Sequence, residues 1–222
     1  MIAGLLVSLA LAQSPKVEGV FVIRVDTQEV ARETFTIGSG RLASGAQGWT
    51  MTATARYDQP RPPLVLAPTL EIAHDTTPVT LQFDVANPRE PVRILGQLGR
   101  NRYTVRTVAR SFERAREFPV QLPLVVLDDS VFSLYQVAAW FAGPRPVSVV
   151  AVVARAPRRE VLTVTDAGSD STIVNRRASQ LRHVTVSGGE NQLVHLWLDE
   201  NRRLIKVEIP SRRLVAERAP SD

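Results

Sequence analysis

Hydrophobic and polar residues alternate over short stretches of this chain from residue 16 onward. The pattern is clearest at residues 49–57, where threonine and apolar side chains take turns. A period of two residues is typical of a β-strand with one buried face, and prolines and glycines separate the stretches. The pattern predicts strands at residues 20–26, 30–37, 49–57, 64–74, 79–86, 92–98, 102–109, 147–155, 160–165, 171–174, 181–187, 192–199, 202–209 and 213–217.

The last hairpin carries enough pattern to predict a register. If residues 200–201 form a two-residue turn, Leu196 lies opposite Ile205 on the buried face. His195 then lies opposite Lys206 on the outer face. Asn201 is the turn residue that tolerates the left-handed conformation.

The middle of the chain departs from this pattern, since Asp128 and Asp129 are its only charges between positions 118 and 144. The spacing predicts a helix over residues 131–141, with the two aspartates capping its N-terminus. A helix that is apolar nearly all round has to be covered on most of its surface. The sequence therefore predicts a mainly β fold, in which a curved antiparallel sheet (a half-barrel) wraps one central apolar helix at residues 130–142.

The N-terminus carries a second apolar pattern, because residues 2–12 are uncharged and end in Ala10-Leu11-Ala12. Small residues three positions and one position before a cleavage point are typical of secretory signal peptides. We expect residues 1–12 to be a signal peptide and residues 13–222 to form a single exported β domain in the periplasm or cell envelope. The alternative is a buried first strand or helix.

Composition excludes several classes of site. The chain of 222 residues contains no cysteine, so disulfides, cysteine-ligated zinc, iron–sulfur clusters, cysteine nucleophiles and a lipid-anchoring cysteine are all excluded. No stretch after residue 12 reaches about 18 uncharged apolar residues, so we expect no transmembrane span in the mature chain.

The charge balance does not indicate nucleic-acid binding. There are 27 basic and 22 acidic residues. Lys16 and Lys206 are the only lysines, so the other 25 basic residues are arginines. These arginines are interleaved with acids, whereas a nucleic-acid interface gathers basic residues on one face. We therefore expect no nucleic-acid partner.

Two motifs resemble catalytic or cofactor signatures but lack the required context. Gly38, Gly40 and Ala43 match a dinucleotide-binding spacing, yet a strand follows them instead of the helix that would hold a pyrophosphate. Asp75-Thr76-Thr77 lacks the glycine of an aspartic protease motif and occurs once. We expect no cofactor and no enzymatic activity.

The three histidines, His74, His183 and His195, have no second histidine or carboxylate at a metal-binding spacing. The predicted register also places His195 beside the cationic Lys206. We therefore expect no metal site.

Aromatic residues on the predicted helix and on one strand are the candidates for a binding cavity. Trp49 and Tyr57 are eight residues apart on one strand and share a face. The predicted ligand-lining residues are Trp49, Tyr57, Phe132, Tyr135 and Trp140, with the entrance between the loops at 38–48 and 59–63. Plain core packing is the alternative for each of them.

Residues 127–135 (Leu-Asp-Asp-Ser-Val-Phe-Ser-Leu-Tyr) and 195–208 (His-Leu-Trp-Leu-Asp-Glu-Asn-Arg-Arg-Leu-Ile-Lys-Val-Glu) resemble an uncharacterised group of exported bacterial β-proteins. The resemblance implies a curved antiparallel sheet around a helix, much as in periplasmic lipoprotein carriers. It implies no known reaction and no agreed ligand.

These observations favour a non-catalytic exported protein that binds a lipophilic or amphipathic ligand, such as a lipid, inside the half-barrel. The alternative is a structural or partner-binding envelope protein whose interior is fully packed. A cavity between helix and sheet distinguishes the two.

Overall fold

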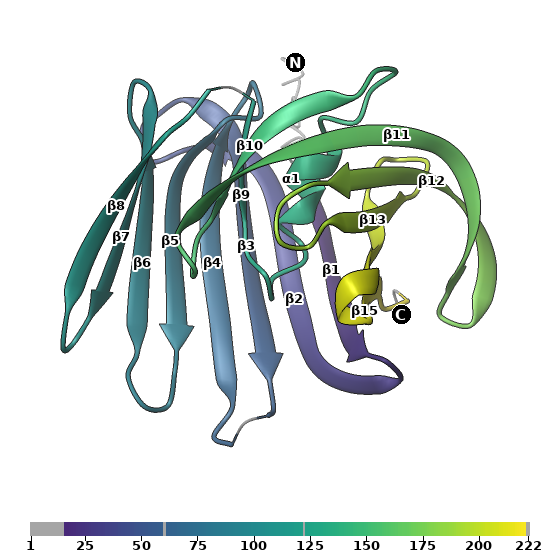
Figure 1. Ribbon diagram of the computed structural model, residues 1–222, viewed down its shortest axis with the longest axis horizontal. Helices are drawn as coiled ribbons and strands as arrows, with labels where there is room; N and C mark the ends of the chain where they lie inside the picture. Colours follow the sequence, from purple (N-terminus) through teal and green to yellow (C-terminus); the bar gives the residue numbers. More distant parts are fainter. Residues whose placement is uncertain (1–15, 60, 122, 221–222) are drawn as a thin grey trace, which may run out of the picture.

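The computed structural model describes residues 16–59, 61–121 and 123–220, and it consists mainly of one large curved β-sheet (Figure 1). The sheet has 15 strands in the order β8-β7-β6-β5-β4-β3-β2-β1-β15-β14-β13-β12-β11-β10-β9. The strands are β1 (Lys16–Val25), β2 (Gln28–Arg41), β3 (Gln47–Tyr57), β4 (Leu64–Ala73), β5 (Pro78–Ala86), β6 (Val92–Leu98), β7 (Arg102–Ala109), β8 (Glu113–Pro119), β9 (Leu124–Leu127), β10 (Val147–Val153), β11 (Arg158–Val174), β12 (Arg177–Ser187), β13 (Leu193–Leu198), β14 (Leu204–Ile209) and β15 (Leu214–Arg218).

The topology joins the two ends of the described chain in the middle of the sheet, because β1 pairs with both β2 and β15. Neighbouring strands are antiparallel except for β9 and β10, which run parallel. The sheet does not close into a complete barrel, since β8 and β9 end the strand order. The prediction of a mainly β, curved antiparallel sheet is confirmed.

Alternation along β3 shows why these residues form a sheet with one covered face. Met51, Ala53 and Ala55 are buried, whereas Thr52 and Thr54 between them are exposed. β-Branched threonine suits the pleated outer surface, and the apolar positions join the core. Burying a side chain of the size of Met51 stabilises a fold by roughly 1.5–3 kcal/mol.

The structure contains two strands that were not predicted, and it joins two of the predicted strands into one. β8 is exposed and rich in charge, as is usual for an edge strand, so it shows no apolar alternation. The four residues of β9 are all buried, which also removes the period of two. The strands predicted at 160–165 and 171–174 are both part of β11, which passes a register shift beside Gly168.

The helix is shorter than predicted. α1 spans Tyr135–Ala139, and all five residues are buried, whereas the sequence predicts a helix over residues 131–141. The backbone N–H groups of Phe132 and Ser133 donate to the carboxylate of Glu33, at 2.7 and 2.9 Å. These bonds satisfy N–H groups that have no acceptor within the helix. The turn that follows is closed by hydrogen bonds of the tighter i→i+3 type, from Tyr135 to Phe132 and from Gln136 to Ser133, so the α-helix itself begins only at Tyr135.

The expected capping role of Asp128 and Asp129 is wrong, because both carboxylates bind arginines from the β10–β11 turn and β11. Asp128 accepts two hydrogen bonds from Arg155, at 2.8 and 3.0 Å. Asp129 forms an ion pair with Arg158 at 3.1 Å. The N-cap residue of α1 is Leu134, whose side chain makes no capping hydrogen bond.

The predicted register of the last hairpin is also wrong, because the turn holds three residues instead of two. Arg202, not Asn201, adopts the left-handed conformation, with φ of 59°. A three-residue turn that ends in a left-handed residue is a common hairpin form. The longer turn shifts the pairing by one residue, and a register shift between Trp197 and Leu198 adds another. Leu196 therefore lies opposite Val207, and Lys206 lies opposite Trp197.

None of the helices in the described ranges has the length and apolar character needed to cross a membrane. The signal peptide predicted at residues 1–12 lies outside the described residues.

Candidate functional site

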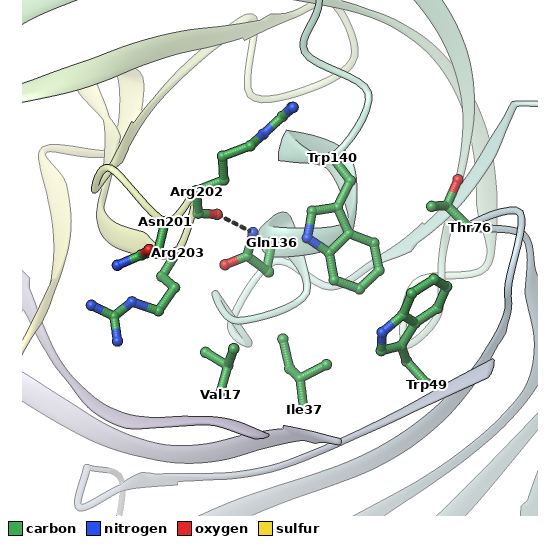
Figure 2. A pocket seen from close by; sticks show the side chains of 9 residues that line it. All are labelled: Val17, Ile37, Trp49, Thr76, Gln136, Trp140, Asn201, Arg202 and Arg203. Carbon is green, nitrogen blue, oxygen red and sulfur yellow. Dashed lines mark hydrogen bonds between the residues drawn. The ribbon is translucent and has the colours of Figure 1, made fainter. Parts of the chain in front are cut away.

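A pocket of about 400 Å³ lies between the inner face of β1–β3, the region of α1 and the β13–β14 turn (Figure 2). Such a volume lies within the range of small-molecule sites. The pocket is lined by Val17, Ile37, Trp49, Thr76, Gln136, Trp140, Asn201, Arg202 and Arg203.

The sheet provides an apolar wall. Val17 of β1 lies directly opposite Ile37 of β2 in the strand register. Trp49 of the next strand, β3, continues the same wall and is half-buried. Alternation along each strand turns these three side chains inward while their neighbours point outward.

Two tryptophans of the lining contact each other. Trp140 directly follows α1, and its ring centroid lies 5.5 Å from that of Trp49, with the ring planes tilted by 49°. Trp49 also stacks on His74, with ring centroids 5.4 Å apart. Neither indole N–H of this tryptophan pair donates a hydrogen bond to a residue that the structure describes. Each indole therefore offers an apolar surface and a free donor.

Gln136 fixes the polar side of the pocket. Its side-chain amide donates to the backbone oxygen of Arg202 at 3.0 Å, and its side-chain oxygen accepts from the N–H of Leu204 at 2.7 Å. These bonds tie the buried helix to the β13–β14 turn. Gln136 thus positions the turn and has little hydrogen-bonding capacity left for a ligand.

Two arginines on that turn carry the charge of the site. The guanidinium of Arg202 donates to the backbone oxygen of Ala142 at 3.0 Å. Arg203 forms an exposed ion pair with Asp199 at 2.6 Å. Within the described residues, Arg202 has no carboxylate partner in a salt bridge.

The structure brings two of the five predicted lining residues, Trp49 and Trp140, to this pocket. Tyr57 lies at the opposite end of β3, where its hydroxyl donates to the backbone oxygen of Ser130 at 2.8 Å. Burial there raises the pKa of Tyr57. Phe132 is fully buried, and the buried Tyr135 accepts a hydrogen bond from Asn191 at 3.3 Å.

The predicted entrance is also placed differently. Residues 38–41 and 47–48 belong to β2 and β3, so the first loop is confined to residues 42–46. The turn residues that line this pocket are Thr76, on the same side as Trp49, and Asn201, Arg202 and Arg203 of the β13–β14 turn, on the other side (Figure 2).

The sequence analysis did not predict Val17 and Ile37 as lining residues, although both lie on predicted or extended strands. It also missed Thr76, Asn201, Arg202 and Arg203. These four residues lie on turns, where no periodicity marks an inward-facing position. The three-residue turn of the last hairpin, which the sequence did not predict, lets Arg202 reach the segment after α1, where it donates to Ala142.

One carboxyl group, that of Glu33, is buried among the core residues of β2. Glu33 is fully buried on β2, and burial raises its pKa from 4.5 to about 7. The N–H groups of Phe132 and Ser133 oppose that rise by stabilising the carboxylate. Glu33 serves as a structural acceptor and does not line the pocket.

Two histidines that the sequence separates come together on the other face of the sheet. Nε2 of His183 lies 2.9 Å from Nδ1 of His195, and the His183 ring stacks on Trp197 with centroids 5.0 Å apart. His195, His183 and Trp197 thus form a row of stacked rings, and Nζ of Lys206 lies 4.7 Å from the centre of the Trp197 ring. Within the described ranges no three metal-binding side chains gather at one point.

Comparison of the sequence with protein families finds no match, and comparison with curated proteins finds none. The chain is similar in structure to a β-barrel-like protein of the domain of unknown function DUF1849 from Brucella abortus, with a TM-score of 0.51 and 13% identity over 93% of this chain and 96% of that chain. It is also similar to a DUF1089 family protein from Pseudomonas aeruginosa, with a TM-score of 0.44 and 16% identity over 95% and 98% of the two chains. The first similarity supports the fold, and it agrees with the resemblance to uncharacterised β-proteins.

Proposed function

We propose that this protein is exported and binds a lipophilic or amphipathic molecule without changing it chemically. The observation that carries the proposal is the pocket of about 400 Å³ that Trp49 and Trp140 help to line. Apolar ligands bind by removing their own surface and the lining surface from water, and indole rings provide large, rigid contact areas.

The pocket has few groups that could carry out a reaction. Its lining residues contain no carboxylate, imidazole or thiol. Thr76 is the only hydroxyl-bearing residue of the lining, and no acid or base among the other lining residues could activate it. A binding role therefore agrees better with this lining than acid–base or nucleophilic catalysis.

Native mass spectrometry of the protein isolated from its host tests the binding proposal. We expect a bound organic species that is lost on denaturation and that is reduced in a Trp140→Ala variant. Phe112→Ala is the matched control, because Phe112 is an exposed aromatic residue outside the pocket. An unliganded protein that also fails to bind added amphiphiles would instead favour the structural or partner-binding envelope role.

The export part of the proposal rests on the apolar run at residues 2–12 and the small residues before position 13. Intact-mass measurement of the protein from the periplasmic or extracellular fraction should show a chain that begins at Gln13. Recovery of the uncleaved chain from the cytoplasmic fraction alone would contradict export.

A further inference from the structure

We propose that the molecule bound in this pocket is an anionic amphiphile, with its charged head beside Arg202 and Arg203 and its apolar chain along Val17, Ile37 and the contacting pair Trp49 and Trp140. This inference rests on the proposed binding function and adds the chemical class of the ligand. It follows from the polarity, the hydrogen-bonding capacity and the charge of the lining.

The lining is divided into two sides. Figure 2 shows Asn201, Arg202 and Arg203 on one side of the pocket, and Trp49 with Thr76 on the other. Val17 and Ile37 lie along the sheet between the two sides (Figure 2). A ligand that fills this space meets apolar side chains at one end and polar, cationic side chains at the other.

Hydrogen-bond donors dominate the side chains that remain available. Both arginines and both tryptophans carry donors and no acceptor. Gln136 is already engaged with the β13–β14 turn through its amide nitrogen and its oxygen. The lining therefore favours a ligand group made of acceptors, as a carboxylate or a phosphate is.

The charge of the lining residues also favours an anionic ligand group. Among the residues that the structure describes, Arg202 and Arg203 are the only charged ones that line the pocket. Asp199 neutralises Arg203 in part, through an exposed contact of the kind that contributes little energy. One N–H of the Arg202 guanidinium donates to the backbone oxygen of Ala142, and the other N–H groups of the planar guanidinium are available to a ligand.

The backbone at Arg202 permits a test that separates ligand binding from folding. A φ of 59° is a conformation that glycine adopts without the cost that a side chain brings. Arg202→Gly therefore removes the guanidinium and relieves the backbone together. Arg176 has a φ of 66° on the β11–β12 turn, outside the pocket, so Arg176→Gly is the matched control.

Tryptophan fluorescence can report binding directly. Trp197 is the third tryptophan of the chain and lies outside the pocket, so the measurements use a Trp197→Phe background. Bromine-labelled dodecanoate, whose bromine quenches indole emission on contact, is titrated into the protein at low ionic strength. Unlabelled dodecanoate, dodecyl phosphate and dodecanol then compete with it. The first two distinguish a carboxylate from a phosphate head, and the third lacks the charge.

We expect dodecanoate or dodecyl phosphate to compete at least about tenfold better than dodecanol, a ratio that corresponds to about 1.4 kcal/mol. Arg202→Gly should weaken binding of the anionic competitors by about that factor and leave dodecanol unchanged. Arg176→Gly should change neither, and added salt should reduce the preference for the anions.

The outcomes separate the two proposals. Equal competition by dodecanol, or unchanged dodecanoate binding in Arg202→Gly, would refute the anionic ligand and leave the binding function standing. If neither bromine-labelled dodecanoate nor bromine-labelled dodecanol quenches the indole emission of a protein with an unchanged melting temperature, both proposals are refuted.

Discussion

Glu33 occupies an inward-facing position of β2, where Ala31 and Phe35 on either side of it are buried core residues. A fully buried carboxyl without a cationic partner favours its neutral form, and burial raises its pKa to about 7. The folded protein therefore binds a proton between about pH 4.5 and 7 that the unfolded chain releases. By linkage, this contribution to stability is complete below the unfolded pKa of 4.5 and is lost as the pH rises through 7.

Glu33→Gln tests this dependence, because glutamine keeps the shape and one acceptor but does not titrate. We expect the free energy of unfolding of the variant, relative to the parent protein, to increase as the pH rises from about 5 to about 8. Urea denaturation at several pH values measures the difference. A constant difference across that range would show that Glu33 is ionised throughout.

His183 has the opposite pH dependence. Its pKa is lowered by burial first and by the neighbouring His195 second, while Asp170 and Glu208 oppose the shift. Lys206, which lies over Trp197 in the same row, adds a positive charge nearby. A depressed histidine pKa means that the unfolded chain binds the proton more readily. The corresponding stability is present above about pH 6.5 and is lost on acidification.

His183→Phe should remove that acid sensitivity while keeping the stacking on Trp197. The urea midpoint of the parent protein should fall more steeply below about pH 6.5 than that of the variant. His74→Gln serves as the comparison, since His74 lies in a different region, against Trp49. Identical pH profiles for the parent and His183→Phe would rule out His183 as the titrating group.

At the scale of elements, α1 is too short to be stable by itself, since helices of one or two turns do not persist in water. Tertiary contacts therefore hold it in place. Glu33 binds the backbone just before the helix, and Gln136 binds the β13–β14 turn from within the helix.

Gln136→Leu should remove the second of these links at nearly constant volume. We expect a loss of about 1–3 kcal/mol in the free energy of unfolding, because the buried N–H of Leu204 loses its acceptor. Hydrogen exchange should accelerate at Leu204 more than at strands far from the turn, such as β6. Uniform acceleration over the whole sheet would contradict a local link.

Sequence reasoning identified the interior strands because alternation is a local property, as β3 and β6 show. It missed the inward-facing Glu33, although its place between Ala31 and Phe35 in the same alternation was a usable signal. It overestimated the helix because an apolar segment does not reveal which backbone groups find tertiary partners. It did not place Arg202 and Arg203 in the pocket, because their positions depend on the geometry of the last hairpin turn. That turn holds three residues, whereas two were predicted.

At the scale of the whole molecule, the sheet ends at β8 and β9 without joining them (Figure 1). Two arginines connect β8 to the β10–β11 region across this gap. Arg116 donates to the backbone oxygen of Pro157 at 3.1 Å, and Arg159 donates to the backbone oxygen of Pro119 at 2.9 Å. Both contacts are exposed, so each should contribute at most about 1 kcal/mol to stability.

Removing both arginines should therefore loosen one edge of the molecule without unfolding it. In the Arg116→Ala, Arg159→Ala double variant, we expect faster hydrogen exchange in β8 and β7, and a global stability within about 1 kcal/mol of the parent. Arg106→Ala is the control, because its ion pair with Glu113 joins β7 to β8 within the sheet and does not cross the gap. If exchange in β8 stays unchanged in the double variant, the edge is held by its pairing with β7 alone. If the melting transition is lost, the two contacts are part of the cooperative core.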